Sequence, residues 1–539
     1  MSEFWIWSNS LFGEISLDFF TNWTELIAFD IGNNKFVGRI PPEIGWATKL
    51  QILFLWSNNL SGPIPPKIGR LVDLQELNLS ENFLTGPIPR SIGNLTRLIY
   101  LALVYNNLNG TIPSEIGNMT ALIYLYISGS KITSPIPSKL GNLVQLQSLR
   151  VNNNSLIGPI PTELGNLTLL RSLHLNNNRL IGPIPTELGN LTLLRSLHLN
   201  NNSLIGPIPT ELGNLAQLQS LHLSNNSLIG EIPSSLKNCK QLVVLDLGEN
   251  GIYGNIPEWL GEKLSSLRVL RLTSNMLSGS IPPQLSLLSS LQLLDLAHNN
   301  ISGSIPQSLG NLTAMAEGIQ ERKKTTNFSY PVYYSNSVSI VWKGREVAFQ
   351  NRLSLVVGID LSENYLRHAI PTELTNLSEL VFLNLSRNLL DGSIPEMIGN
   401  LKKLEILDLS MNYLSSTIPL SITSLTFLDS FNLSNNHLSG RIPSGNQLQT
   451  LDDPSIYSGN SELCGFPLTK SCSSIQASDV QLSTDDDDEK IWLYLSIGLG
   501  FVVGSWGFFG ILFFKRSLRL AYFRYIDDVY DSFSRILMR

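Results

Sequence analysis

The chain has 539 residues, of which 15% are charged, and a formal net charge of −6. A general nucleic-acid binder is basic, so this balance argues against that class. Three cysteines are too few for a disulfide-stapled scaffold. The length would correspond to about three or four globular domains unless the chain is a repeat array.

The N-terminal stretch, MSEFWIWSNS, has neither the basic start nor the apolar core of a secretory signal peptide. An incomplete repeat begins almost at once, near Phe4. We therefore expect that the chain starts within its own architecture and that the signal peptide is absent from this sequence.

A repeat with the pattern L-x-x-L-x-L-x-x-N-x-L-x-G-x-I-P fills the segments 1–313 and 355–443. One such unit cannot bury its leucines alone, but stacked units share a continuous core. The pattern therefore predicts an α/β solenoid of 17 units, counting the partial one at Phe4. The complete units begin at Leu26, Leu50, Leu74, Leu98, Leu122, Leu146, Leu170, Leu194, Leu218, Leu242, Leu267, Leu291, Val356, Leu380, Leu404 and Leu428.

Each fixed letter of this pattern has a physical role. The x-L-x-L core alternates as a strand with one buried face does. The Asn lies where the chain turns and is expected to satisfy buried backbone groups. The Gly allows a tight bend, and the Pro is expected to end the ladder pairing because it has no N–H donor. One unit departs, with Ser130 for Asn and Ser134 for Gly, and is predicted to be looser but in register.

The x positions of the strands face away from the core and form the candidate binding surface. In the early repeats they hold large aromatic side chains, a residue type enriched at the centres of interfaces. Metal binding is disfavoured here because neighbouring rungs of a flat ladder do not converge tetrahedrally. The candidates for ligand contact are Phe54, Trp56, Tyr100, Tyr105, Tyr124 and Tyr126, followed by Arg150, His174, His198 and His222.

The three histidines occupy one equivalent position in adjacent repeats, where strands lie roughly 4.8 Å apart. Such a ladder could bind an anion when protonated, or sense pH, because like charges depress histidine pKa values. The segment 156–178 recurs letter for letter at 180–202. The ladder is therefore also explained as a by-product of duplication.

An insert at 314–354 interrupts the repeats. It alternates from Val338 to Phe349 around Lys343-Gly344, which predicts a β-hairpin. Long insertions in compact domains are uncommon unless they are functional or disordered. We expect a functional insert, with Tyr333, Tyr334, Trp342, Lys343 and Arg345 as its candidate contact residues.

A C-terminal cap is expected at 444–483, because the end of a solenoid exposes apolar core. Cys464 and Cys472 lie in this segment, and an extracellular setting would favour a disulfide between them. Cys239 lies within a repeat and is interpreted as a small buried core residue.

The segment 491–514 contains no charge and is long enough to span a bilayer. An acidic run at 484–490 precedes it, and Lys515 and Arg516 follow, which places the repeats outside the cell and the tail, 515–539, in the cytoplasm. Small residues at Gly500 and Gly504 would let two membrane helices approach closely. The tail is too short for a catalytic domain, and no pocket-forming catalytic constellation stands out, so no enzyme activity and no cofactor are expected.

The order of these parts resembles that of plant leucine-rich-repeat receptor-like proteins, which are single-pass membrane receptors without a kinase. The resemblance rests on the L-x-G-x-I-P half of the repeat, the insert before the last four repeats, the L-C-G-F-P-L cap, the acidic run, the glycine-rich span and the short tail. It implies a curved superhelix with a parallel β-sheet on its concave side. It also implies an extracellular ligand, a microbial elicitor or an apoplastic peptide, and a role in defence or development.

By the same resemblance, Gly500 and Gly504 would contact an adaptor receptor kinase, and the insert would help to bind ligand or a co-receptor kinase. The resemblance also places the protein in the plasma membrane, and G-N-L-T and related sequons on the convex side are expected to be glycosylated if the chain is secreted. Two other functions stay open: an inhibitor of secreted microbial hydrolases, and a truncated or decoy receptor. The expected glycan sites are Asn94, Asn118, Asn166, Asn190, Asn311 and Asn376.

Overall fold

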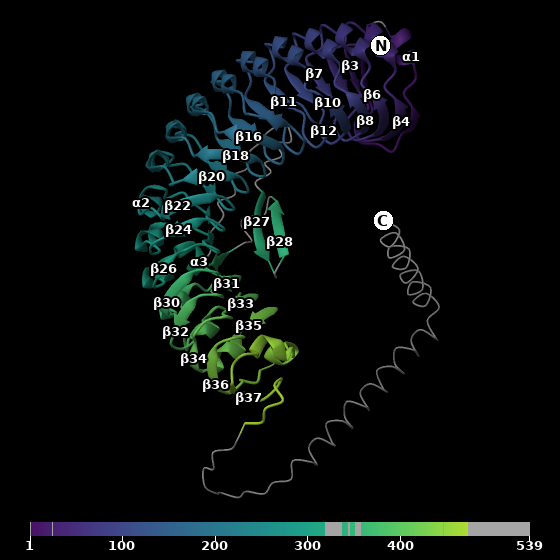
Figure 1. Ribbon diagram of the computed structural model, residues 1–539. Helices are drawn as coiled ribbons and strands as arrows, with labels where there is room; N and C mark the ends of the chain where they lie inside the picture. Colours follow the sequence, from purple (N-terminus) through teal and green to yellow (C-terminus); the bar gives the residue numbers. More distant parts are fainter. Residues whose placement is uncertain are drawn as a thin grey trace, which may run out of the picture. The chain divides into compact units, whose positions relative to one another are not determined.

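The computed structural model describes residues 2–23, 25–317, 337–342, 345–350, 357–445 and 447–472. These residues belong to one compact unit that ends at Cys472. Its repeats stack one after another along a curved row (Figure 1).

Among the described residues, 17 strands form one parallel sheet, one strand for each repeat that the pattern predicts. Each strand pairs with the strand of the next repeat in register, as Leu173 with Leu197 and Leu197 with Leu221. The strands are β1 (Glu3–Trp5), β3 (Ala28–Asp30), β5 (Ile52–Phe54), β7 (Glu76–Asn78), β9 (Tyr100–Ala102), β11 (Tyr124–Tyr126), β13 (Ser148–Arg150), β15 (Ser172–His174), β17 (Ser196–His198), β19 (Ser220–His222), β21 (Val244–Asp246), β23 (Val269–Arg271), β25 (Leu293–Asp295), β29 (Gly358–Asp360), β31 (Phe382–Asn384), β33 (Ile406–Asp408) and β35 (Ser430–Asn432).

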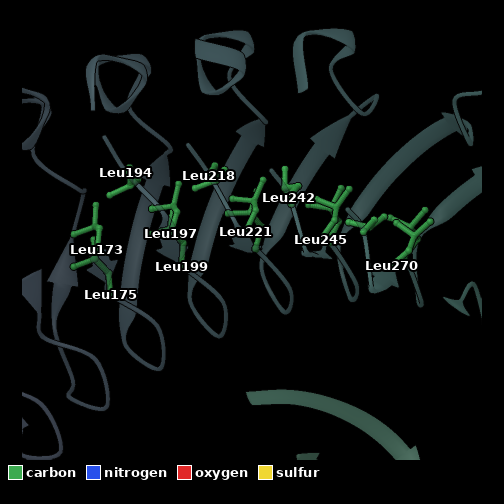
Figure 2. Packing of buried hydrophobic residues seen from close by; sticks show 14 of the residues in the cluster. Leu173, Leu175, Leu194, Leu197, Leu199, Leu218, Leu221, Leu242, Leu245 and Leu270 are labelled. Atoms are coloured by element: carbon green, nitrogen blue, oxygen red, sulfur yellow. The ribbon is translucent and has the colours of Figure 1, made fainter. Parts of the chain in front are cut away.

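The leucines of the pattern build one core that continues from repeat to repeat. Figure 2 shows Leu173, Leu197 and Leu221 stacked behind successive strands. All three are fully buried, as are their neighbours along the row. Truncating one such leucine to alanine costs about 2–5 kcal/mol in a packed core, so each position is under strong constraint.

The asparagines of the pattern satisfy the backbone at the turn after each strand. The Asn82 Nδ2 donates to the carbonyl oxygens of Leu55, Leu79 and Ser80 at 2.9, 3.2 and 3.1 Å. The Asn82 Oδ1 accepts the backbone N–H of Leu60 at 3.0 Å. Each asparagine therefore ties its own turn to the previous repeat, which confirms the role expected from the sequence.

The Gly and Pro half of the repeat differs from expectation, because it forms a second set of parallel strands instead of ending the pairing. In β8, Thr85 pairs with Pro63 of the preceding repeat, and Gly86 adopts a φ of 76° that favours glycine. Proline is tolerated because it stands at the end of these short strands. The strands are β2 (Phe12–Glu14), β4 (Lys35–Arg39), β6 (Asn59–Pro63), β8 (Phe83–Pro87), β10 (Asn107–Gly110), β12 (Lys131–Ile132), β14 (Ile157–Gly158), β16 (Arg179–Pro183), β18 (Ser203–Pro207), β20 (Ser227–Gly230), β22 (Gly251–Asn255), β24 (Met276–Ser278), β26 (Ser302–Gly303), β30 (Tyr365–Ala369), β32 (Leu389–Asp391), β34 (Ser415–Thr417), β36 (His437–Arg441) and β37 (Glu462–Cys464).

The convex side carries short helices, mostly single 3₁₀ turns that follow the Pro of the repeat. Three elements are α-helical: α1 (Asp18–Thr21), α2 (Trp259–Lys263) and α3 (Thr313–Glu317). The 3₁₀ turns are η1 (Pro42–Trp46), η2 (Pro66–Arg70), η3 (Arg90–Asn94), η4 (Ser114–Asn118), η5 (Ser138–Asn142), η6 (Thr162–Asn166), η7 (Thr186–Asn190), η8 (Thr210–Asn214), η9 (Ser234–Asn238), η10 (Pro283–Leu287), η11 (Gln307–Asn311), η13 (Thr372–Asn376), η14 (Ile398–Asn400), η15 (Leu420–Ser424), η16 (Leu448–Thr450) and η17 (Pro454–Tyr457).

The repeat with Ser130 and Ser134 keeps its register in the main sheet but interrupts the second one. Tyr124 still pairs with Ser148 across β11 and β13. In the second ladder, β12 has two residues, and the contact toward β14 is reduced to an isolated bridge between Pro135 and Ile157. The Ser130 hydroxyl reaches one carbonyl, that of Asn106, where an asparagine would bond several backbone groups.

The insert contains a hairpin where the alternation predicts one. Strands β27 (Ser337–Trp342) and β28 (Arg345–Gln350) are antiparallel, with Trp342 paired to Arg345. The predicted contact residues Tyr333, Tyr334 and Lys343 lie outside the described residues.

The cap continues the solenoid by the same contacts that join the repeats. The Asn460 Nδ2 donates to the Leu433 carbonyl at 3.0 Å, and its Oδ1 accepts the Leu438 N–H at 3.0 Å. A disulfide joins Cys464 to Cys472. Cys239 is buried in the repeat core, and burial raises the pKa of its thiol to about 11.

No helix within the described ranges is long and apolar enough to cross a membrane. The predicted span 491–514 with Gly500 and Gly504, the acidic run 484–490 and the tail 515–539 lie outside those ranges.

Candidate ligand-binding face

The first and third residues of each strand of the main sheet point away from the leucine core. In β15, for example, the buried Leu173 lies between Ser172 and His174. Two rows of side chains therefore run across the face of the sheet opposite the core. We call this surface the binding face, and it changes in character along the solenoid.

Three tyrosines cluster on the binding face in the early repeats. The ring of Tyr100 lies 6.2 Å from that of Tyr124 and 5.8 Å from that of Tyr126, in edge-to-face arrangements. The guanidinium of Arg150 lies 5.1 Å from the centroid of the Tyr126 ring. All four side chains are half-buried, so their orientations are constrained while part of each surface faces solvent.

The other predicted aromatics do not join this cluster. Phe54 is separated from Tyr100 by β7, whose Glu76 and Asn78 lie between them. Trp56 follows β5 and packs over Gly32, where any β-carbon would collide with the indole. Tyr105, expected on the concave face, lies in the turn after β9 with a φ of 51° and is exposed there.

The three histidines do form a ladder, but it is buried where an exposed one was expected. The rings of His174 and His198 stack 4.1 Å apart, and that of His222 follows 4.3 Å from His198. Serine hydroxyls lie between them: the Ser196 Oγ is 2.9 Å from the His174 Nε2 and 3.0 Å from the His198 Nε2. Close lateral stacking of strands lets each ring cover its neighbour, and at most 5% of any of the three is exposed.

Burial decides the charge of this ladder. Desolvation holds the pKa values of His174 and His198 well below the usual 6.5, and the positive charge of Arg150 lowers both further. His174 and His198 are therefore neutral at physiological pH. The ladder does not form an exposed cationic site for anions. Among the described residues, no cluster of three or more His, Cys, Asp or Glu side chains has a metal-binding arrangement.

The same row continues into a buried charged network that sequence reasoning missed. Asp246 lies 3.7 Å from His222 and 3.3 Å from Arg271. Arg271 also reaches Glu249 at 2.6 Å and Asp295 at 3.4 Å. Reading the third strand position beyond His222 would have found it, because Asp246, Arg271 and Asp295 occupy that position in the next three repeats.

The network holds its carboxyl groups in different protonation states. Burial alone would raise the pKa of Asp246, but Arg271 and His222 outweigh it and lower that pKa to about 2. Burial and the neighbouring carboxyl of Asp360 raise the pKa of Asp295 to about 7. Asp360 is register partner to Asp295 on β29, and burial raises its pKa as well. The two carboxyls thus behave as a pair that favours holding a proton.

A buried apolar row accompanies the charged network at the first strand position. It consists of Val244, Val269, Leu293 and Phe382, each at most 3% exposed. The binding face therefore divides into a half-exposed aromatic region on β9 to β13, a buried polar ladder on β15 to β19 and a buried charged and apolar region on β21 to β31.

The six predicted glycan sites share one position on the convex side. Each asparagine is the last residue of a 3₁₀ turn and is exposed. Their Nδ2 atoms are thus accessible, away from the binding face. They are Asn94, Asn118, Asn166, Asn190, Asn311 and Asn376.

Comparison with known families matches much of the repeat array to leucine-rich-repeat families. Residues 89–204 match the family described as a leucine-rich repeat region, and residues 48–108 match a second leucine-rich-repeat family. Further single leucine-rich repeats match at 217–239, 266–288, 290–312, 379–401, 403–425 and 427–448.

Two curated relatives come from Solanum lycopersicum. Receptor-like protein EIX2 is 57% identical over 203 residues, and receptor-like protein EIX1 is 52% identical over 217 residues. These regions are 36% and 38% of this chain but 20% and 21% of the relatives, so the matched part spans about a fifth of their length.

Solved receptor structures share the fold. The leucine-rich-repeat ectodomain of the Arabidopsis thaliana receptor kinase GASSHO1/SCHENGEN3, in complex with CASPARIAN STRIP INTEGRITY FACTOR 2, has a TM-score of 0.67 and 33% identity over 86% of this chain and 56% of its own. The plant peptide hormone receptor RGFR1 in complex with RGF2 has a TM-score of 0.66 and 33% identity over 84% of this chain and 77% of its own.

Proposed function

Because this chain belongs to the plant leucine-rich-repeat receptor-like proteins, we propose that it is a cell-surface receptor that binds an extracellular ligand on its binding face. The ligand is a microbial elicitor or an apoplastic peptide, and the receptor signals in plant defence. Signalling is by recruitment of a receptor kinase through the charge-free segment 491–514, where Gly500 and Gly504 would allow close helix approach. The insert and the binding face then contact ligand or a co-receptor kinase.

The tyrosine cluster is the observation that supports ligand binding most directly. Tyr100, Tyr124 and Tyr126 offer aromatic surface at low entropic cost, because their rings already hold one another in place. Arg150 adds a positive charge at the edge of the cluster. A peptide or protein ligand with an apolar anchor beside an acidic group fits this arrangement.

Ligand binding is tested with the full chain in detergent and a panel of secreted microbial proteins and synthetic apoplastic peptides on a biosensor. For any probe retained by the wild type, Tyr100→Ala with Tyr126→Ala is expected to weaken binding at least tenfold, as loss of interface aromatics does. Tyr365→Ala, an exposed tyrosine on β30, is the matched control. Undiminished binding by the double variant would remove the tyrosine cluster from the ligand site.

Kinase recruitment is tested by co-precipitation from plant membranes. Gly500→Leu with Gly504→Leu is expected to lose the kinase partner, because bulky side chains prevent close helix approach. Phe501→Leu, an apolar change at the adjacent position, should keep it. Retention of the partner by the double leucine variant would show that recruitment does not use this motif.

A further inference from the structure

The second set of strands exposes a row of large apolar side chains in five successive repeats. Strands β14, β16, β18, β20 and β22 carry Ile157, Ile181, Ile205, Ile229 and Tyr253, which we call the isoleucine stripe. Each of these side chains is 45–52% exposed. The same position holds Thr85, Asn109 and Thr133 in preceding repeats and Ser278 and Ser302 in following ones.

The stripe is not required by the core of the solenoid. Each isoleucine alternates with a fully buried leucine such as Leu180, Leu204 or Leu228, which already fills the interior. Parallel pairing sets Pro183 beside Ile205 and Pro207 beside Ile229, which widens the apolar surface. A row of exposed apolar side chains that extends over five repeats is typical of a functional surface.

The stripe is complementary to itself. Ile205 is its middle rung, with two apolar rungs on either side. A twofold axis lying in the contact plane at Ile205, across the stripe, would set Ile181 against Ile229 and Ile157 against Tyr253 of the other copy. The four isoleucine rungs and Tyr253 recur once per repeat, which allows the two faces to interdigitate as packed sheets do.

The charges beside the stripe favour the same antiparallel arrangement. Arg179 is paired to Ile157 at one end and is exposed. Glu231 is exposed at the other end, where its Cγ lies 3.1 Å from the position of a β-carbon on Gly254. Antiparallel stacking therefore brings the basic end of one copy toward the acidic end of the other, twice in each pair.

The asparagines next to the stripe are held by one another. The Nδ2 of Asn201 donates to the Asn177 Oδ1 at 2.5 Å, and the Nδ2 of Asn225 donates to the Asn201 Oδ1 at 3.0 Å. Asn201 and Asn225 are both sequons, and Nδ2 is the atom to which a glycan attaches.

From these observations we propose that the isoleucine stripe is a homotypic contact through which two copies of this chain pack face to face and antiparallel about Ile205. A patch of this kind covers a few hundred Å², below the roughly 800 Å² per partner of a standard stable interface. The association is therefore weak and reversible, and it depends on local concentration.

Disulfide trapping of two differently tagged full-length copies in the same cells tests the geometry. Ile205→Cys is expected to yield a cross-linked dimer, because the two residues meet at the axis. Ile181→Cys on one copy should link to Ile229→Cys on the other at least fivefold more than to a second Ile181→Cys. The native cysteines do not interfere, since Cys239 is buried and the other two are bonded.

Thr85→Cys, at the same position of an earlier repeat, is the matched control for exposure and reactivity. The proposal is wrong if Ile205→Cys gives no more dimer than this control, or if Ile181→Cys links to itself as well as to Ile229→Cys. Cross-linking of the stripe cysteine to a different protein, without a dimer, would assign the surface to another partner.

Replacing the three central isoleucines by threonine tests the energetics. Ile181→Thr, Ile205→Thr and Ile229→Thr keep β-branched side chains of the type that neighbouring repeats carry, so the strands should persist. Co-precipitation of the two tagged copies is expected to fall at least tenfold, with unchanged hydrogen exchange in β15 to β21 as the check on folding. Unchanged co-precipitation would overturn the proposal.

Discussion

At the scale of single residues, the binding face is governed by burial. A histidine on the exposed side of a three-residue strand would ordinarily titrate near neutral pH. Here identical rings stack in register, and each covers the next, so His174 and His198 lose contact with water. Serine hydroxyls supply their hydrogen bonds, which stabilises the neutral rings. The histidine ladder is therefore a buried polar contact that links adjacent repeats.

The buried histidines predict a loss of local stability in acid. Their folded pKa values are depressed, so below about 6.5 the unfolded chain binds more protons, and stability falls as the pH falls. The slope is up to about 1.4 kcal/mol per pH unit for each histidine. His174→Asn with His198→Asn should flatten it, as measured by hydrogen exchange of β15 to β19 between pH 7.5 and 5.5.

His437→Asn, a change of an exposed histidine, provides the control and should leave that slope as in the wild type. An unchanged slope in the double variant would mean that the two histidines are not the titrating groups.

The raised pKa of Asp295 predicts a pH dependence of stability opposite to that of the histidines. Its folded pKa is raised to about 7, so the folded chain binds more protons between pH 4 and 7, and stability falls as the pH rises through that window. Asp295→Asn removes the charge but keeps an acceptor for the Ala297 N–H. The variant should slow hydrogen exchange of β23 to β29 more at pH 8 than at pH 5. An equal effect at both values would contradict the raised pKa.

At the scale of elements, the asparagine ladder joins one repeat to the next, and Ser130 marks its weakest rung. An asparagine at that place in other repeats bonds carbonyls of its own turn and of the previous repeat. Ser130 is too short to do so, and the second ladder is interrupted beside it. The solenoid thus has a built-in boundary between its early and middle repeats.

Ser130→Asn is expected to strengthen this boundary. By analogy with Asn106, the new side-chain amide would accept a hydrogen bond from the Leu108 N–H and donate to nearby carbonyls. The free energy of unfolding should rise by about 1 kcal/mol. Hydrogen exchange of β10 and β12 should slow correspondingly. Asn82→Ser, the reverse change in a repeat with its asparagine in place, should accelerate hydrogen exchange around β6. If hydrogen exchange in the Ser130→Asn variant is not slowed, the new amide does not reach its partners.

At the scale of the whole molecule, the array is quasi-one-dimensional, since each repeat contacts its neighbours and one leucine core runs through them. The duplicated segment fits this architecture because it encodes one complete turn. Copying it lengthens the array and leaves the contacts on either side unchanged.

Deletion of residues 180–203 should therefore be tolerated. The new junction joins Arg179 to Leu204, which restores the same sequence, and β15 then pairs with β19 in the register now used by β17. Circular dichroism should keep its shape, and thermal unfolding should stay cooperative. Deletion of residues 180–191, which removes half of one solenoid turn, should abolish folding. If the two deletions behave alike, stability does not depend on complete repeats.

The sequence by itself determined the elements that depend on local pattern: the period, the strand in each repeat, the asparagine turns and the pairing of β27 with β28. These follow because alternation, turn chemistry and backbone satisfaction act within one unit and its neighbour. Tertiary structure alone decided which binding-face residues are exposed. Stacking of the repeats buries His198 and Asp295 but leaves Tyr100 half-exposed. Stacking also pairs the Gly and Pro half of each repeat into a second set of strands, on which Ile205 is exposed. Burial and lateral pairing are properties of adjacent repeats acting together, so the pattern of one repeat does not contain them.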